Sequence, residues 1–89
     1  MGYFLISYDL GAAIEDYGPF IEEIQKIGNA WQCMESLWVV KSNETSGLLK
    51  EQLTQHLNED DKLLVVGIKR HGASYNLSKE CSDLLSKKI

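Results

Sequence analysis

Strand-type and helix-type segments follow one another along this chain in an order that few folds accommodate. The first segment, residues 3–9, reads Tyr-Phe-Leu-Ile-Ser-Tyr-Asp and is mostly aromatic or aliphatic. This composition predicts a buried central strand that carries the carboxylate of Asp9 to the rim of a sheet. Leu10 and Gly11 follow, and we expect the strand to end there.

Helical periodicity appears in three later segments. Residues 20–27 repeat apolar side chains at helical spacing after Pro19, which suits a first helical turn. The polar stretch 42–46 is rich in N-cap residues and precedes a helix with leucines at intervals of four. A terminal helix is expected to start at Asn76 as its cap. Its apolar stripe comprises Leu77, Cys81, Leu84 and Leu85.

The remaining apolar runs are typical of strands. Residues 30–34 and 37–41 predict an antiparallel hairpin around Glu35 and Ser36. One longer strand with a bulge is the alternative, because this pair lacks the glycine that tight hairpin turns favour. The acidic turn 58–61 is expected to end the second helix, and residues 63–68 predict another buried strand after it.

These segments together predict an α+β fold of the ferredoxin-like type, with the order βαββαβ and a helix added at the C-terminus. The whole chain, residues 1–89, forms a single domain in this prediction. Two helices cover one face of an antiparallel sheet. The last helix or a partner subunit is expected to cover the other face.

Charge and cysteine content restrict the function classes. The net charge is −4, and the excess of acids falls in residues 1–40, so generic nucleic-acid binding is not favoured. The longest apolar run, residues 63–66, is too short for a membrane span, and no leader-like segment precedes residues 3–9. Cys33 and Cys81 belong to no metal-binding motif, and two reduced cysteines in a cytoplasmic protein are the simplest interpretation. A disulfide stays open as the alternative.

Three stretches carry a family resemblance. They are Tyr8-Asp9 at the end of the first strand, the hairpin from Trp31 to Trp38, and the last strand within residues 61–69. Over roughly residues 3–86 the chain resembles the CRISPR-associated protein 2 family, in particular its small stand-alone relatives that carry a SinR-family label. The resemblance implies a homodimer of ferredoxin-like subunits. It also implies either a metal-dependent nuclease, such as an endoribonuclease, or a non-catalytic adaptor that holds DNA.

Asp9 is the residue that matches the family's acidic position, and it is the candidate catalytic and metal-binding residue. One carboxylate is a weak site for Mg²⁺, which prefers six oxygens in octahedral geometry. In a two-fold dimer, two copies of Asp9 could share one hydrated ion. The alternative is that Asp9 caps the turn at Gly11 through backbone amides. The chain departs from the family pattern in the wider spacing of Gln32 and Ser36.

The basic triplet Lys69-Arg70-His71 is the candidate nucleic-acid-binding segment. Arg70 offers a bidentate fork to phosphate, and His71 a proton donor or acceptor near neutral pH. The alternative is a set of charges that guards an exposed strand edge. Two functions therefore stay open. One is a homodimer that engages nucleic acid or a protein and acts as a magnesium-dependent nuclease; the other is a dimeric interaction module without catalysis or cofactor.

Overall fold

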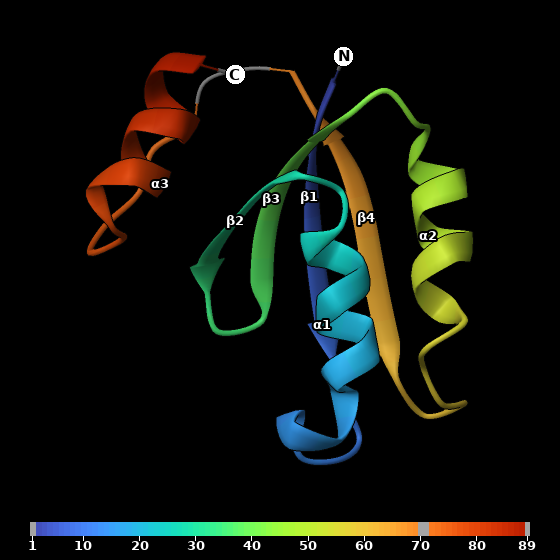
Figure 1. Cartoon of the computed structure of the whole chain (residues 1–89). Helices are drawn as coiled ribbons and strands as arrows, with labels where there is room; N and C mark the ends of the chain where they lie inside the picture. The colour runs from blue at the N-terminus through green and yellow to red at the C-terminus, as the bar shows by residue number, and fades with distance from the viewer. Residues whose placement is uncertain (1, 70–71, 89) are drawn as a thin grey trace.

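A computed structural model describes residues 2–69 and 72–88 of the chain, and its elements follow the predicted order. Four antiparallel strands form one sheet with the spatial order β2-β3-β1-β4 (Figure 1). This order is that of a ferredoxin-like fold and confirms the predicted α+β class. The elements are β1 (Gly2–Asp9), the 3-10 turn η1 (Ile14–Tyr17), α1 (Gly18–Gln25), β2 (Asn29–Met34), β3 (Leu37–Ser42), α2 (Ser46–Thr54), β4 (Lys62–Ile68), α3 (Lys79–Asp83) and the π-helical turn η2 (Leu84–Lys88).

The first strand occupies the centre of the sheet, as the sequence predicts. β1 pairs with β3 on one side and with β4 on the other. Because side chains alternate along a strand, β1 sends one set of residues to each face. Phe4, Ile6 and Tyr8 are buried against α1 and α2, where the main core lies. The residues between them face away from these helices.

The hairpin β2–β3 turns at Glu35 and Ser36, and β2 contains a bulge between Gln32 and Met34. The predicted hairpin is therefore confirmed, and the alternative of one longer strand is wrong although β2 does contain a bulge. The bulge adds one residue to β2 at Cys33 and bends this edge strand locally.

Helix boundaries differ from the predictions at two places. α2 begins after Thr45, whose hydroxyl accepts a hydrogen bond from the Leu48 amide, and it ends at Thr54 rather than further on. In the terminal helix the cap is Ser78, which accepts from the Cys81 amide, and not Asn76. Asn76 has a φ of 61°, in the left-handed region, whereas an N-cap residue needs extended backbone.

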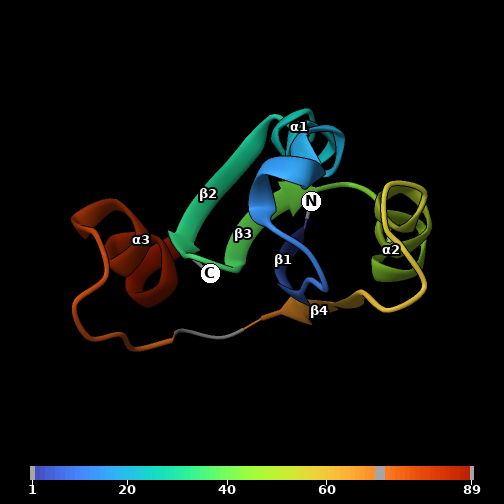
Figure 2. The same ribbon diagram turned by 90° about the horizontal axis from the view of Figure 1, so that it is seen from below.

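The face of the sheet opposite α1 and α2 is called the open face below. α3 and η2 cover it over β2 and β3, as Figure 2 shows from below. A second apolar cluster forms there around Cys33, Val39, Cys81 and Leu84. The lower half of β1 and β4 on the same face has no such cover, and Leu64 and Val66 are 55% and 43% exposed. The terminal helix thus covers only part of the open face.

Candidate functional site

Asp9 is exposed at the end of β1, and its register partner on β4 is Lys62. Among the described residues, no hydrogen bond or ion pair holds the Asp9 carboxylate. Asp9 borders two surface hollows. One, of about 220 Å³, has Ser7, Lys62 and Leu64 in its lining. The other, of about 420 Å³, lies toward the β2–β3 hairpin.

The turn after β1 is capped by Asp61 rather than by Asp9. Asp61 Oδ1 accepts a hydrogen bond from the Gly11 amide at 2.8 Å and another from the Tyr17 hydroxyl at 2.7 Å. Its Oδ2 accepts from the Asn58 amide at 2.7 Å. The capping role that was the alternative for Asp9 therefore belongs to Asp61, and the Asp9 carboxylate is exposed to solvent.

These contacts shift the pKa values of both partners. The pKa of Asp61 is lowered, first by the Gly11 amide, then by the Asn58 amide and the Tyr17 hydroxyl, while desolvation opposes them. The pKa of Tyr17 is raised, first by its hydrogen bond to Asp61 and then by burial. The neutral phenol and the charged carboxylate are thus the preferred pair near neutral pH. Sequence reasoning missed both residues, because Tyr17 and Asp61 are 44 positions apart.

The larger hollow beside Asp9 contains the hairpin residues that the sequence pointed to. Gln32, Glu35 and Ser36 line it together with Asp9. Gln32 Nε2 donates to the Glu35 carbonyl at 3.2 Å, which orients the amide along the hairpin turn. The sheet therefore brings Asp9, Gln32 and Ser36 to one hollow. It does so although Gln32 and Ser36 are further apart in the sequence than in the family pattern.

Two consecutive hydrogen bonds connect the core to the residues that line this hollow. The Trp38 indole Nε1 donates to the Tyr8 hydroxyl at 3.1 Å, and that hydroxyl donates to the Glu35 carbonyl at 3.3 Å. Burial raises the pKa of Tyr8, with a smaller contribution in the same direction from Glu35 and an opposing one from Trp38. Tyr8 is therefore a neutral structural group that fixes the hairpin over the end of β1.

The ligand set for a metal ion is incomplete within one chain. Among residues 2–69 and 72–88, no group of three or more His, Cys, Asp or Glu side chains converges. The nearest charged neighbour of Asp9 in the strand register is the cationic Lys62, which does not suit a divalent cation. The residues of a single chain do not fit a bound Mg²⁺, so the magnesium site stays a hypothesis that needs a second copy of Asp9.

The structure separates the two groups of predicted site residues. Lys69 directly follows β4 at the end opposite Lys62, which pairs with Asp9. Seven strand positions at about 3.3 Å each put Lys69 roughly 23 Å from this pair. Arg70 and His71 lie outside the described residues. The candidate phosphate-binding residue and the candidate catalytic residue therefore lie at opposite ends of the sheet.

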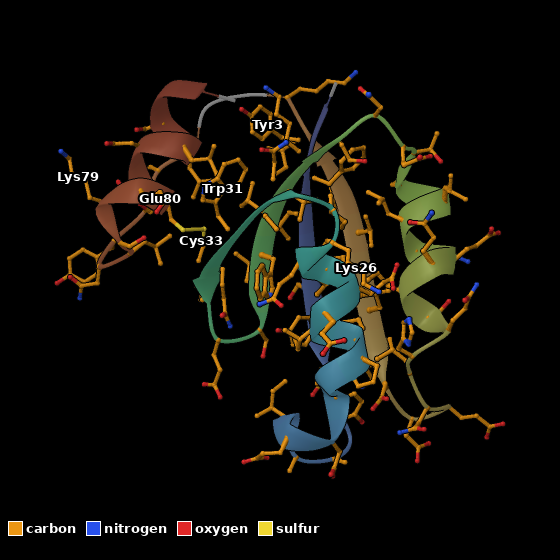
Figure 3. All side chains as sticks on the ribbon, viewed as in Figure 1. Tyr3, Lys26, Trp31, Cys33, Lys79 and Glu80 are labelled. Carbon is orange, nitrogen blue, oxygen red and sulfur yellow. A yellow bond between two sulfur atoms is a disulfide. The ribbon has the colours of Figure 1, made fainter. Side chains whose placement is uncertain are left out.

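The cysteines form a disulfide, which corrects the expectation of two reduced thiols. Cys33 on β2 and Cys81 on α3 are bonded, with their Cα atoms 5.7 Å apart (Figure 3). The 48-residue separation and the absence of a spacing motif left no local signal for this pairing. It depends on where the terminal helix docks.

No protein-family model matches the chain, and no solved structure matches it significantly. In the part of the chain that the structure describes, no helix is long and apolar enough to cross a membrane.

Proposed function

We propose that this protein acts as a homodimeric interaction module whose uncovered apolar surface binds a second copy of the chain. The observation that carries the proposal is a strip on the open face, formed by Leu5, Ser7, Leu64 and Val66 and called the bare strip below. Leu5 pairs with Val66 and Ser7 pairs with Leu64 in the strand register, so the four side chains are contiguous. Leu64 and Val66 are exposed, whereas Leu5 and Ser7 are half-buried. Neighbouring exposed apolar side chains mark interaction surfaces.

A second copy fits this strip because the surface is self-complementary. Asp9 and Lys62 lie together at one end of the strip and supply one charge of each sign. In a two-fold contact each copy presents the same patch, so an acid of one copy can face a base of the other. The net charge of −4 argues against a polyanion as the main occupant.

The relationship to the CRISPR-associated protein 2 family and a cytoplasmic location belong to the same proposal. The ferredoxin-like sheet and the strand-terminal Asp9 support the relationship. A protein partner would bind to the dimer rather than replace one copy. Nucleic acid is a less favoured partner, because the exposed Lys69 lies far from the hollows beside Asp9.

Light scattering over a range of protein concentrations tests the proposal. We expect a mass of twice that of one chain, which falls toward one chain only on strong dilution. A mass of one chain at millimolar protein would overturn the proposal.

A magnesium-dependent nuclease is the second candidate, and the availability of the Asp9 carboxylate beside the bare strip favours it. The test is incubation of purified protein with labelled RNA and with double-stranded DNA, with and without Mg²⁺ or Mn²⁺. The Asp9→Ala variant is run in parallel. Metal-dependent cleavage that the variant lacks supports this candidate. Absent cleavage, or cleavage equal in the variant, removes it and leaves the interaction module.

A further inference from the structure

The terminal segment α3–η2 is joined covalently to the sheet through Cys33 and Cys81. Figure 3 shows Cys33 and Trp31 directed toward this segment, with Lys79 on its outer side. Val39 lies beneath the segment and is buried in one cluster with Cys81 and Leu84 of the segment itself. Tyr3 and Trp31 pack against this cluster. The segment therefore covers apolar side chains that would otherwise face solvent.

Two valines on the open face, one under the segment and one outside it, differ in their exposure to solvent. Val39 on the open face is 0% exposed under the segment, whereas Val66 on the same face is 43% exposed outside it. Removing the segment would extend the exposed apolar surface from β1 and β4 across β3 to β2. The position of the segment thus sets how much of the open face is accessible, and the disulfide joins this segment to β2.

Local structure alone gives this segment little reason to stay in place. α3 and η2 follow each other directly and together form one helical segment over residues 79–88, which is shorter than the roughly 12–15 residues that an isolated helix needs for marginal stability. Residues 72–78, which precede it, contain no helix or strand and are largely exposed. The Gly72 amide donates to the Leu85 carbonyl at 2.7 Å, and this bond joins the segment to the connection that precedes it rather than to a strand of the sheet.

The disulfide lies at the bulge of the edge strand β2. Cys33 lies at the register shift of an edge strand and is 9% exposed, whereas Cys81 is 2% exposed. Attack by an external thiolate requires access to one sulfur in line with the bond, and we expect it at Cys33 Sγ because Cys33 is the less buried of the two cysteines.

We propose that the Cys33–Cys81 disulfide is a redox-controlled clasp, which holds α3–η2 on the open face when oxidised and releases the segment when a dithiol reduces it. A dithiol thiolate attacks Cys33 Sγ, the S–S bond breaks, and Cys81 leaves as a thiolate and takes up a proton. The second thiol of the reductant resolves the mixed disulfide and frees Cys33 as a thiol. Two electrons and two protons pass from the dithiol, which becomes a disulfide.

The proposal does not depend on the dimer, because release of the segment is a property of one chain. It gives a physical role to a disulfide in a protein proposed to be cytoplasmic, where such bonds are usually redox-sensing or catalytic. Reduction would enlarge the apolar surface beside the bare strip and so alter what the open face can bind.

Hydrogen-exchange mass spectrometry on the full chain tests the clasp. The protein is measured oxidised, after reduction with dithiothreitol, and after reoxidation, with the thiol count verified by alkylation. We expect exchange in residues 79–88 to accelerate by about tenfold or more on reduction, as for a locally unfolding unit, and to slow again on reoxidation. Amides of β1 should not change. A Cys33→Ser/Cys81→Ser variant should show the fast exchange with and without dithiothreitol.

Trp31 fluorescence provides a second readout at the covered surface. Its emission should shift to longer wavelength on reduction, and a Trp31→Phe variant, which keeps the buried Trp38, should show no shift. Three results would overturn the proposal: free thiols in the oxidised preparation, unchanged exchange in residues 79–88 after verified reduction, or equal acceleration in every segment. The last result would mean that the segment is not separable from the fold.

Discussion

Tyr17 donates its hydroxyl hydrogen to Asp61 across 2.7 Å, and this bond joins the start of α1 to the turn before β4. The same carboxylate holds the Gly11 amide, so one side chain fixes the loop that follows Asp9. We therefore expect the substitution Asp61→Asn to lower the urea midpoint of unfolding near neutral pH. The pKa of Asp61 is lowered in the folded state, so its contribution is full above its unfolded value of about 4 and is lost as the pH falls below that value. The difference in unfolding free energy between the wild type and Asp61→Asn should narrow below pH about 4.

An unfolding free-energy difference between these two proteins that stays constant down to pH about 2 would contradict the role given to the Asp61 carboxylate.

The Tyr17 hydroxyl is expected to make the folding stability depend on pH in the alkaline range. Its pKa is raised by the Asp61 carboxylate, so the stability that it contributes is present below about pH 10 and is lost as the pH rises through the folded value. We expect Tyr17→Phe to be less stable than the wild type at pH 7 and to lose less stability between pH 9 and 11, as followed by chemical denaturation. Equal losses for the two proteins in this range would show that the phenol does not titrate against Asp61. Tyr17→Phe should still lose some stability at alkaline pH, because the pKa of Tyr8 is also raised in the folded state.

Tyr8 accepts the indole hydrogen of Trp38 inside the core. In Tyr8→Phe this buried donor loses its acceptor, and we expect unfolding free energy to fall by about 1–3 kcal/mol. Tyr75 is 86% exposed and provides the matched control. Tyr75→Phe should stay within about 0.5 kcal/mol of the wild type. Similar values for both variants in urea unfolding would remove the energetic role of the Trp38–Tyr8 bond.

Asp9 is expected to contribute little to stability, in contrast to Asp61. Its carboxylate is exposed, and the cap of the Gly11 turn comes from Asp61. We expect Asp9→Asn to unfold within about 0.5 kcal/mol of the wild type, whereas Asp61→Asn unfolds at lower urea. A clear loss in Asp9→Asn would restore Asp9 as a structural cap and weaken its candidacy as a functional residue.

Side-chain periodicity was sufficient to predict the fold class, because each element is specified by its own residues. The alternation in β1 and the helical spacing of Phe20 and Ile24 both reflect burial against the core that the structure shows. The helix caps were less predictable, since Asn76 and Ser78 are both suitable cap residues and only the backbone at residue 76 excludes the first.

The sequence predicted a site residue only where its position at the end of one element was enough to identify it. Asp9 follows from the end of a strand, but the contact of Asp61 with Gly11 spans 50 positions and is set by the pairing of β1 with β4. The disulfide likewise depends on the docking of α3 against β2, which no local pattern encodes. The distance between Asp9 and Lys69 also follows from strand register, which residue types do not specify.

The bare strip gives the most direct test of the proposed dimer. Leu64 and Val66 are exposed in one chain, so the double substitution Leu64→Glu/Val66→Glu should leave the fold intact, as circular dichroism would verify. Leu48, which is 40% exposed on α2, provides the control Leu48→Glu at a position away from the strip. Light scattering on the three proteins at equal concentration is the decisive measurement. We expect the wild type and Leu48→Glu to have twice the mass of one chain and the double variant to have the mass of one chain. A double variant that is folded and keeps the mass of two chains would contradict dimerisation through this face.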